Sequence, residues 1–312
     1  TGADNLANIT QSGDDNEANV NQDGDNVAGT SNTATVNQSG DDGDIDIDQD
    51  DDNTATVTVP SNSDSEYAQV NQEDEGNEAT VTQRGEDDAA YVEQDGDDND
   101  ATVTQGSPAE GNIADIDQDG DQNAAVISQD GEDSDATINQ GIGFAQGNNA
   151  TITQTNNADE SSATTTQLGD DNRAFVVQDS DDNESVINQV LDDNFADVNQ
   201  DDGATSTVNQ LGDNNDAYVL QKGESESLIN QGGVSGFADI DQDGDDNYSE
   251  VNQLGNNQKA TVTQDDDDNT STVNQSGLAG NTATVTQEDG ATSTVNQATL
   301  LLGPGNTAVV DQ

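Results

Sequence analysis

The 312-residue sequence contains no cysteine, histidine, tryptophan or methionine, and only 3% of its residues are aromatic. Without cysteine, no disulfide bond can form. Histidine is the commonest general base and cysteine the commonest thiol nucleophile, so their absence argues against an enzyme. Carboxylates are abundant, but nothing marks a cleft that would hold two of them with separated pKa values. We therefore expect no catalytic activity.

Long apolar runs are also missing: no stretch approaches the roughly 18 residues needed to cross a bilayer, so we expect no membrane insertion. The chain starts at Thr1 and lacks methionine, which suggests a processed, secreted form. Composition alone, with 28% hydrophobic residues, would predict intrinsic disorder.

Basic residues are nearly absent, and 67 acidic side chains give a net charge of −63 against only four basic residues, Arg84, Arg173, Lys222 and Lys259. This charge excludes nucleic acid as a partner and disfavours anionic membranes. It is typical of proteins from salty environments, which suggests a halophilic source, and it makes cations the expected partners. High salt or divalent cations should favour any close association of these chains.

A repeat, N-x-A-x-V-x-Q, overrides the prediction of disorder. We find 27 copies, the first ending at Gln11 and the last at Gln312. Two residues before the final position, 26 of the 27 copies carry Val or Ile. Ala lies four residues before it in 20 copies, and Asn lies six residues before it in 17. A period of two predicts β-strands with one constant, inward face.

The later copies show that two strands make one coil. From Ser185 onward, Ser and Ala alternate four residues before the glutamine, so equivalent strands recur every 21 or 22 residues. We predict an all-β fold, a β-solenoid with two short strands per 21–22-residue coil and about 13–14 coils stacked in register. It should form one domain over residues 1–312, with inserted loops near 23–31, 60–66, 141–148, 155–161 and 298–305.

Stacked Gln and Asn side chains should satisfy one another inside this solenoid. At a strand spacing of about 4.8 Å, equivalent amides can form hydrogen-bonded ladders as in cross-β assemblies. The residues that we assign to this core ladder are Gln94, Gln105, Gln189, Gln200, Gln210, Gln221, Gln242, Gln253, Asn183, Asn247 and Val251.

Aspartates cluster at the turns and offer hard oxygen ligands of the kind that calcium prefers. The best candidates lie in "DQDGDQN" (117–123) and "DQDGDDN" (241–247), namely Asp119, Asp121, Asp243, Asp245 and Asp246. The EF-hand pattern is not met, because the glutamine in each stretch belongs to the core face. The alternative is that Asp and Gly simply form the bend.

The repeats "QSGDDNEANVNQ" (11–22) and "QDGDDNDATVTQ" (94–105) resemble the curlin repeat of bacterial curli subunits. The resemblance implies a secreted subunit that polymerises with copies of itself into an extracellular functional-amyloid fibre, a fimbria-like filament of the biofilm matrix that serves adhesion. The chain has more repeats than typical curlins and is far more acidic.

The ends of the repeat bear on assembly. The repeat begins by Asn5 and runs to Gln312 with no capping helix, so open edges should allow head-to-tail stacking. An odd number of strands, 27, would leave one strand-sized gap at each junction.

The alternative function is a soluble secreted solenoid with an ice-binding or calcium-binding surface. Outward T-x-T pairs support it: Thr80 with Thr82, Thr102 with Thr104, and Thr151 with Thr153. The same face is interrupted further along by Phe175, Val177, Asp197, Asn199, Tyr218, Leu220, Asp239 and Asp241. The β-propensity of threonine therefore explains the pairs better.

Outward apolar residues gather in a few places, namely Phe175, Val177, Tyr218 and Leu220 on one face, with Phe144, Leu300, Leu301 and Leu302 in loops. They suggest lateral contacts with a neighbouring subunit, or loops that fold over the solenoid edge.

Overall fold

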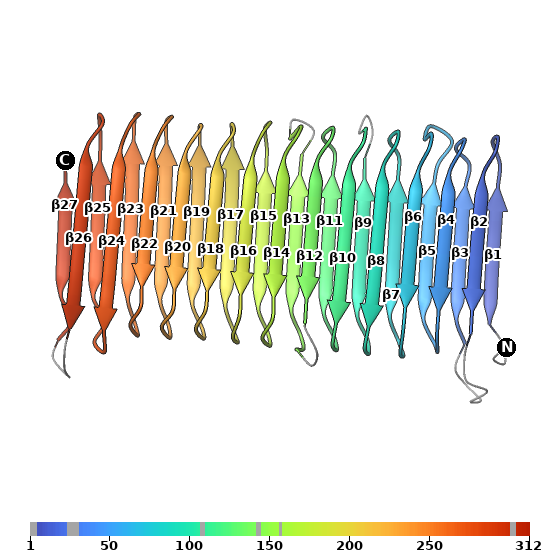
Figure 1. Cartoon of the computed structure of the whole chain (residues 1–312), viewed down its shortest axis with the longest axis horizontal. Coiled ribbons are helices and arrows are strands. Elements are labelled where there is room, and N and C mark those ends of the chain that lie inside the picture. The colour runs from blue at the N-terminus through green and yellow to red at the C-terminus, as the bar shows by residue number, and fades with distance from the viewer. Residues whose placement is uncertain (1–4, 24–30, 107–109, 142–144, 156–157, 300–303) are drawn as a thin grey trace. The chain divides into compact units, whose positions relative to one another are not determined.

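The computed structural model describes residues 5–23, 31–106, 110–141, 145–155, 158–299 and 304–312. The chain divides into two compact units, residues 1–161 and 162–312, which we call unit 1 and unit 2 and describe separately. In each unit, odd-numbered strands run in one direction and even-numbered strands in the opposite direction (Figure 1). The part of the chain that the structure describes includes no helix capable of crossing a membrane.

Unit 1 contains β1(Leu6–Gln11), β2(Glu17–Gln22), β3(Thr33–Gln38), β4(Asp44–Gln49), β5(Thr54–Val59), β6(Tyr67–Gln72), β7(Glu78–Gln83), β8(Ala89–Asp95), β9(Asp100–Gln105), β10(Ile113–Asp119), β11(Ala124–Gln129), β12(Asp135–Gln140) and β13(Asn149–Gln154). Unit 2 contains β14(Ser162–Gln167), β15(Arg173–Gln178), β16(Glu184–Gln189), β17(Phe195–Asp201), β18(Thr205–Gln210), β19(Asp216–Lys222), β20(Glu226–Gln231), β21(Phe237–Asp243), β22(Tyr248–Gln253), β23(Lys259–Asp265), β24(Thr270–Gly277), β25(Thr282–Gln287), β26(Thr292–Thr299) and β27(Thr307–Asp311).

Each unit has two parallel sheets. In unit 1 the odd-numbered strands form one sheet, and the even-numbered strands form the other. Unit 2 repeats this arrangement. We call these the odd sheet and the even sheet of each unit. Because the chain alternates between the sheets, one coil contains two strands, which confirms the predicted β-solenoid.

The register places like side chains over one another. Between β7 and β9, Ala79 pairs with Ala101 and Val81 with Val103. These four side chains are fully buried, with 0% of their surface exposed. Small and β-branched residues therefore fill a thin core between the two sheets, where they pack at the close spacing of the pleated strands.

The turns use left-handed backbone conformations. Asp98 has a φ of 58° and Gly96 a φ of 111°. A Cβ atom on Gly96 would lie 2.3 Å from the carbonyl oxygen of Gly120 in the next coil, so only glycine fits there. Aspartate tolerates the left-handed region better than most residues, which explains its frequency at the other turn positions.

The predicted loops are described only in part. Residues 60–66 join β5 to β6, and Ser63 within them is buried and donates its hydroxyl to the carbonyl of Gln83, at 3.2 Å. Strand β26 continues to Thr299, the second residue of the last predicted loop. Residues 24–30, 142–144, 156–157 and 300–303 of the other loops lie outside the described residues, as do Phe144 and Leu300 to Leu302. The prediction of one domain over residues 1–312 stays a prediction.

A column of buried serines follows the even sheet of unit 2. Their hydroxyls have no hydrogen-bond partner among the described residues, and they belong to Ser185, Ser206, Ser227, Ser249, Ser271 and Ser293. A buried hydroxyl without a partner loses its hydration and gains nothing in return. These serines therefore lower the stability of the coils that contain them.

We expect Ser227→Ala to raise the free energy of unfolding by about 1 kcal/mol, because it removes an unpaired buried hydroxyl at almost constant volume. Urea denaturation measures the change. Ser225→Ala is the matched control in the same coil, since the Ser225 hydroxyl donates to the carbonyl of Gly244 at 2.9 Å and its loss should destabilise. Equal destabilisation by both substitutions would contradict the prediction.

Candidate assembly site

Within each unit, glutamine side chains at the ends of the described strands tie successive coils together. Gln94 at the end of β8 is fully buried and donates from Nε2 to Oε1 of Gln118, at 2.9 Å. The same Nε2 donates to the backbone carbonyl of Glu78 in the facing sheet, at 3.2 Å. One side chain thus joins two coils and also the two sheets of its unit.

We call a row of such glutamines a glutamine column. The structure places all eight glutamines of the predicted ladder in these columns: Gln94 donates to Gln118, Gln83 to Gln105, Gln105 to Gln129, Gln189 to Gln210, Gln210 to Gln231, Gln200 to Gln221, Gln221 to Gln242, Gln242 to Gln264 and Gln253 to Gln275. The donor–acceptor distances run from 2.8 to 3.2 Å.

The asparagines at the start of each strand hold the turns. The Oδ1 atom of Asn183 accepts from the backbone N–H of Ala204 in the next coil, at 2.9 Å, and its Nδ2 donates to the carbonyl of Ser180. Asn247 likewise accepts from the backbone N–H of Asn269, at 3.0 Å, and donates to the carbonyl of Asp266. Val251 of β22 is fully buried in the core of the same coil.

The glutamine columns have a direction. In each bond above, the residue with the lower number donates. At the first coil Gln11 donates to Gln38 at 2.9 Å and Gln22 donates to Gln49 at 3.0 Å. No described residue donates to the Oε1 atom of Gln11 or Gln22. At the other end Gln297 accepts from Gln275 at 2.9 Å and uses one N–H for the carbonyl of Thr282.

The edge strands expose backbone as well as amides. Among the described strands, β1 bonds only to β3. The backbone N–H groups of Leu6 and Ser12, and those of the alternate residues between them, point towards β3. The N–H of Ile9 points to the opposite side, because neighbouring residues in a strand turn their N–H groups to opposite sides. Ile9 is 43% exposed, although its equivalents in later coils are buried. At the other edge, Val310 of β27 is only half-buried, although its partner Val285 in β25 is fully buried.

The turn aspartates bond mostly to backbone. Oδ1 of Asp121 accepts from the N–H of Asp97, at 3.2 Å, and Oδ1 of Asp267 accepts from the N–H of Asp245, at 2.9 Å. These carboxylates tie one turn to the turn of the neighbouring coil. The sequence analysis did not predict this contact between turns, although the recurrence of Asp at the same turn position in successive coils could have indicated it.

The five candidate calcium ligands are spread over two separate turns. Asp119 ends β10, Asp243 ends β21 with its carboxylate 3.4 Å from the Lys222 ammonium, and Asp246 has a left-handed φ of 56°. Over the described ranges, no three acidic, histidine or cysteine side chains come together as they would around a metal ion. The calcium site stays a prediction.

Aromatic rings form a row on the outer face of the odd sheet of unit 2. Phe175, Phe195, Tyr218 and Phe237 come from successive strands, with ring centroids 5.4 to 5.9 Å apart. The ammonium of Lys259 lies 5.0 Å from the centroid of the Phe237 ring and ends the row. The sequence pointed to Phe175 and Tyr218, but Phe195 and Phe237 lie two residues earlier in their strands and were missed.

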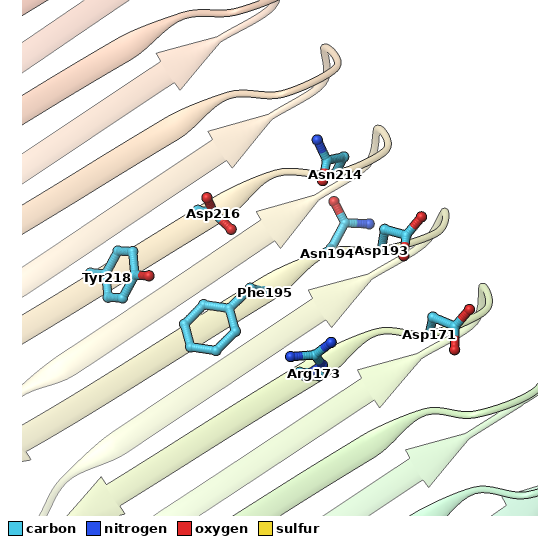
Figure 2. A pocket seen from close by; sticks show the side chains of 8 residues that line it. All are labelled: Asp171, Arg173, Asp193, Asn194, Phe195, Asn214, Asp216 and Tyr218. Atoms are coloured by element: carbon cyan, nitrogen blue, oxygen red, sulfur yellow. The ribbon is translucent and has the colours of Figure 1, made fainter.

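A shallow groove crosses this row. Figure 2 shows the rings of Phe195 and Tyr218 beside Arg173 and Asp216 on the strands, with Asp171, Asp193 and Asn214 nearer the turns. Burial raises the pKa of Asp216, and the pKa of Asp197 on the same face is raised for the same reason. The groove therefore combines flat apolar surface with partly desolvated carboxylates.

Two buried carboxyl groups replace asparagine in the even sheet of unit 1. Glu66 and Asp88 start neighbouring strands, and each side chain is 1% exposed. One oxygen of Glu66 accepts from the N–H of Asp88 at 3.1 Å, and one oxygen of Asp88 accepts from the N–H of Asn112 at 3.0 Å. The other oxygen of each has no partner among the described residues.

The environment favours the neutral form of both groups. Burial, and then the charge of Asp88, raises the pKa of Glu66 to about 8. Burial raises the pKa of Asp88 to about 6, against the opposing effect of its hydrogen bonds from Asn112. A proton on each carboxyl avoids two uncompensated charges inside the solenoid.

We expect the stability of unit 1 to fall as the pH rises from about 4.5 towards 8. The folded state keeps the Glu66 proton over a range where the unfolded state releases it, so unfolding is favoured as protons become scarce. Glu66→Gln should raise the free energy of unfolding at pH 8 and change it little at pH 4. Denaturant titrations at the two pH values measure the effect.

The control is Glu86→Gln, which removes an exposed carboxylate from the next turn on the same edge, the turn that contains Asp88. It should leave the pH dependence nearly unchanged. The same slope in wild type and Glu66→Gln would contradict a buried, protonated Glu66.

Four segments of the chain match the family model of the Curlin associated repeat, at residues 75–106, 110–141, 158–190 and 237–265. Each segment contains three successive strands with their terminal glutamines, from β7–β9 in the first to β21–β23 in the last. No curated protein sequence matches the chain significantly. The family match agrees with the resemblance of the repeats and with the coil geometry, and the chain is therefore a curlin-repeat protein.

Proposed function

We propose that this chain is the structural subunit of an extracellular filament that grows head to tail by extending its sheets, and that it has no catalytic role. The observation that carries the proposal is the complementarity of the edges. Gln11 of β1 offers an unused side-chain acceptor at one edge of the odd sheet, and β27 offers backbone groups at the other edge of the same sheet. Curlin repeats are the sequence pattern of fibre-forming subunits, which supports a functional-amyloid-like fibre in a biofilm matrix or adhesive coat.

Edge strands support the same conclusion. Among the described strands, β1 pairs only with β3 and β27 only with β25, so each presents a row of backbone N–H and C=O groups to solvent. Such an edge is a template for another strand. Adding a subunit in the odd sheet would bury Ile9, which faces inward and is exposed in the single chain.

The number of strands shapes the junction. Over the described residues the odd-numbered strands number 14 and the even-numbered strands 13. A junction made in the odd sheet would therefore leave the even sheet one strand short, as the odd repeat count implied. We propose that β1 meets β27 of the next copy in the odd sheet, where β27 already lies beyond the last even strand.

Charge opposes this assembly and makes it dependent on salt. A net charge of −63 on each copy means that every junction brings like charges together. Two carboxylates about 5 Å apart repel by roughly 0.8 kcal/mol even at the dielectric constant of water. Added salt screens that repulsion. We therefore propose that filaments form in molar salt and dissociate, or fail to form, in dilute buffer.

Ile9→Pro should slow filament growth at least about tenfold. Proline removes the N–H that Ile9 directs away from β3, and prolines in edge strands prevent further pairing. Growth is followed by light scattering and electron microscopy in high salt, after circular dichroism has shown that the monomer folds. Because the N–H of Ile9 bonds to nothing in β3, the single chain should tolerate the change.

Ile9→Ala is the matched control, because it shortens the same side chain and keeps the N–H. It should form filaments at close to the wild-type rate. If Ile9→Pro grows as fast as Ile9→Ala, the β1 edge is not the growing surface. If wild type stays monomeric at high concentration in every salt tested, the filament proposal is wrong.

A further inference from the structure

The outer face of the odd sheet in unit 1 carries no charge along its middle. One column of outward side chains consists of Thr35, Thr56, Thr80, Thr102, Val126 and Thr151. The second column, two residues further along each of the same strands, contains only Asn, Thr and Ser. We call these two columns the Thr face. The charged and aromatic residues that interrupt the T-x-T pattern all belong to unit 2, whereas the interruptions in unit 1, Asn37, Val126 and Ser128, are uncharged.

Composition does not explain this face. The chain has 67 acidic residues, which the inward positions almost wholly exclude, so turns and outward strand positions share them. The even sheet of the same unit follows that expectation, with Asp46, Asp48, Glu93, Asp115 and Asp117 in its two equivalent outward columns. One side of unit 1 is therefore acidic along its middle, while the two middle columns of the other are neutral over six successive strands, with Glu78 and Asp100 in the outward column next to them.

The Thr face is also regular. Thr56, Thr80 and Thr102 pair in register along β5, β7 and β9, and each is half-buried by its neighbours. Threonine is β-branched, so its χ1 is restricted and little entropy is lost when a partner covers it. Its methyl group and hydroxyl suit a sheet-to-sheet contact that is nearly dry.

We propose that the Thr face docks on the Thr face of a second copy, so that two filaments pair side by side. This inference rests on the proposed filament. The partner is a second copy because two chains of −63 charge can approach closely only where neither presents carboxylates, and the Thr face is such a place. Its columns are self-complementary, since both partners present the same side chains at the same coil spacing.

The area of the face explains why the filament is needed. Six strands about 4.8 Å apart, over the roughly 13 Å that two outward positions occupy along each strand, cover roughly 400 Å² on one copy. A stable interface usually buries about 800 Å² on each partner. Single subunits should therefore stay unpaired, whereas filaments, which repeat the face once per subunit, should pair along their length.

The neutral outer face of the even sheet in unit 2 is a poorer partner. Its asparagines already bond to one another along the sheet, as in the bonds from Asn209 to Asn230 and from Asn230 to Asn252, both 2.9 Å. Glu250 interrupts it with a charge, and Leu228 and Tyr248 make it uneven. Pairing of like faces therefore fits better than pairing of the two neutral faces.

The test uses the full chain with Thr102→Asp, which adds one carboxylate to the middle of the Thr face. Wild-type filaments in high salt should be paired, and Thr102→Asp filaments should be single, with half the mass per unit length in electron microscopy. Thr137→Asp is the matched control, because Thr137 is a half-buried threonine of β12 on the acidic side of the same unit. Its filaments should remain paired.

The outcomes separate the two proposals. Paired Thr102→Asp filaments, or single Thr137→Asp filaments, would overturn the pairing and leave the filament intact. Single filaments after Thr272→Asp, on the neutral face of unit 2, would overturn pairing of like faces. If the wild-type protein shows thermal hysteresis and Thr102→Asp abolishes it, the Thr face binds ice and not a second copy. An absence of filaments in all four proteins would refute the proposed function, and the pairing with it.

Discussion

The hydrogen bond between side-chain amides of successive coils is the interaction on which the rest of this structure depends. A thin core of Ala, Val and Ile could not bury enough surface to order so acidic a chain by itself. Buried glutamine resolves the problem because its amide both donates and accepts, so a column of identical residues satisfies itself. Gln94 is an example, since its side-chain amide bonds both to the next coil and to the facing sheet. The repeat length, the register and the parallel sheets all follow from keeping these amides aligned.

The sequence predicted the strands well because inward positions are physically constrained. Period-two spacing, the Ser and Ala alternation and the constant glutamine together specified two strands per coil and the residues of each column. The buried carboxyls were harder to find: Glu66 and Asp88 occupy an asparagine position, but nothing in the sequence shows whether an acidic residue there turns inward. Phe195 and Phe237 were missed because no sequence pattern constrains the outward positions. Whether aromatic rings on neighbouring strands form a row also depends on how those strands place their side chains relative to one another. For the turn aspartates, the sequence left calcium binding and bend formation as alternatives, because it reveals the carboxylate and not the backbone N–H from which it accepts.

Charge and order are separated in space within each coil. Inward positions are almost free of ionisable groups, and turns carry most of the carboxylates, where water can reach them. Two carboxyl groups do lie inside the coils, those of Glu66 and Asp88, and burial raises their pKa values to about 8 and about 6. Four basic residues cannot offset 67 acidic ones, and the Lys222–Asp243 pair is exposed and contributes little. Ionic conditions therefore act on this protein mainly through repulsion between whole coils.

The common direction of the glutamine columns has an electrostatic consequence of its own. Because each amide–amide bond in a column is donated towards the higher-numbered coil, the bond dipoles add instead of cancelling, much as peptide dipoles add along an α-helix. Each unit thus carries an aligned array of dipoles, with its oxygen atoms turned towards the lower-numbered coils. An external electric field, or a charged surface, would orient such molecules with one chosen end forward, which the net charge alone could never do.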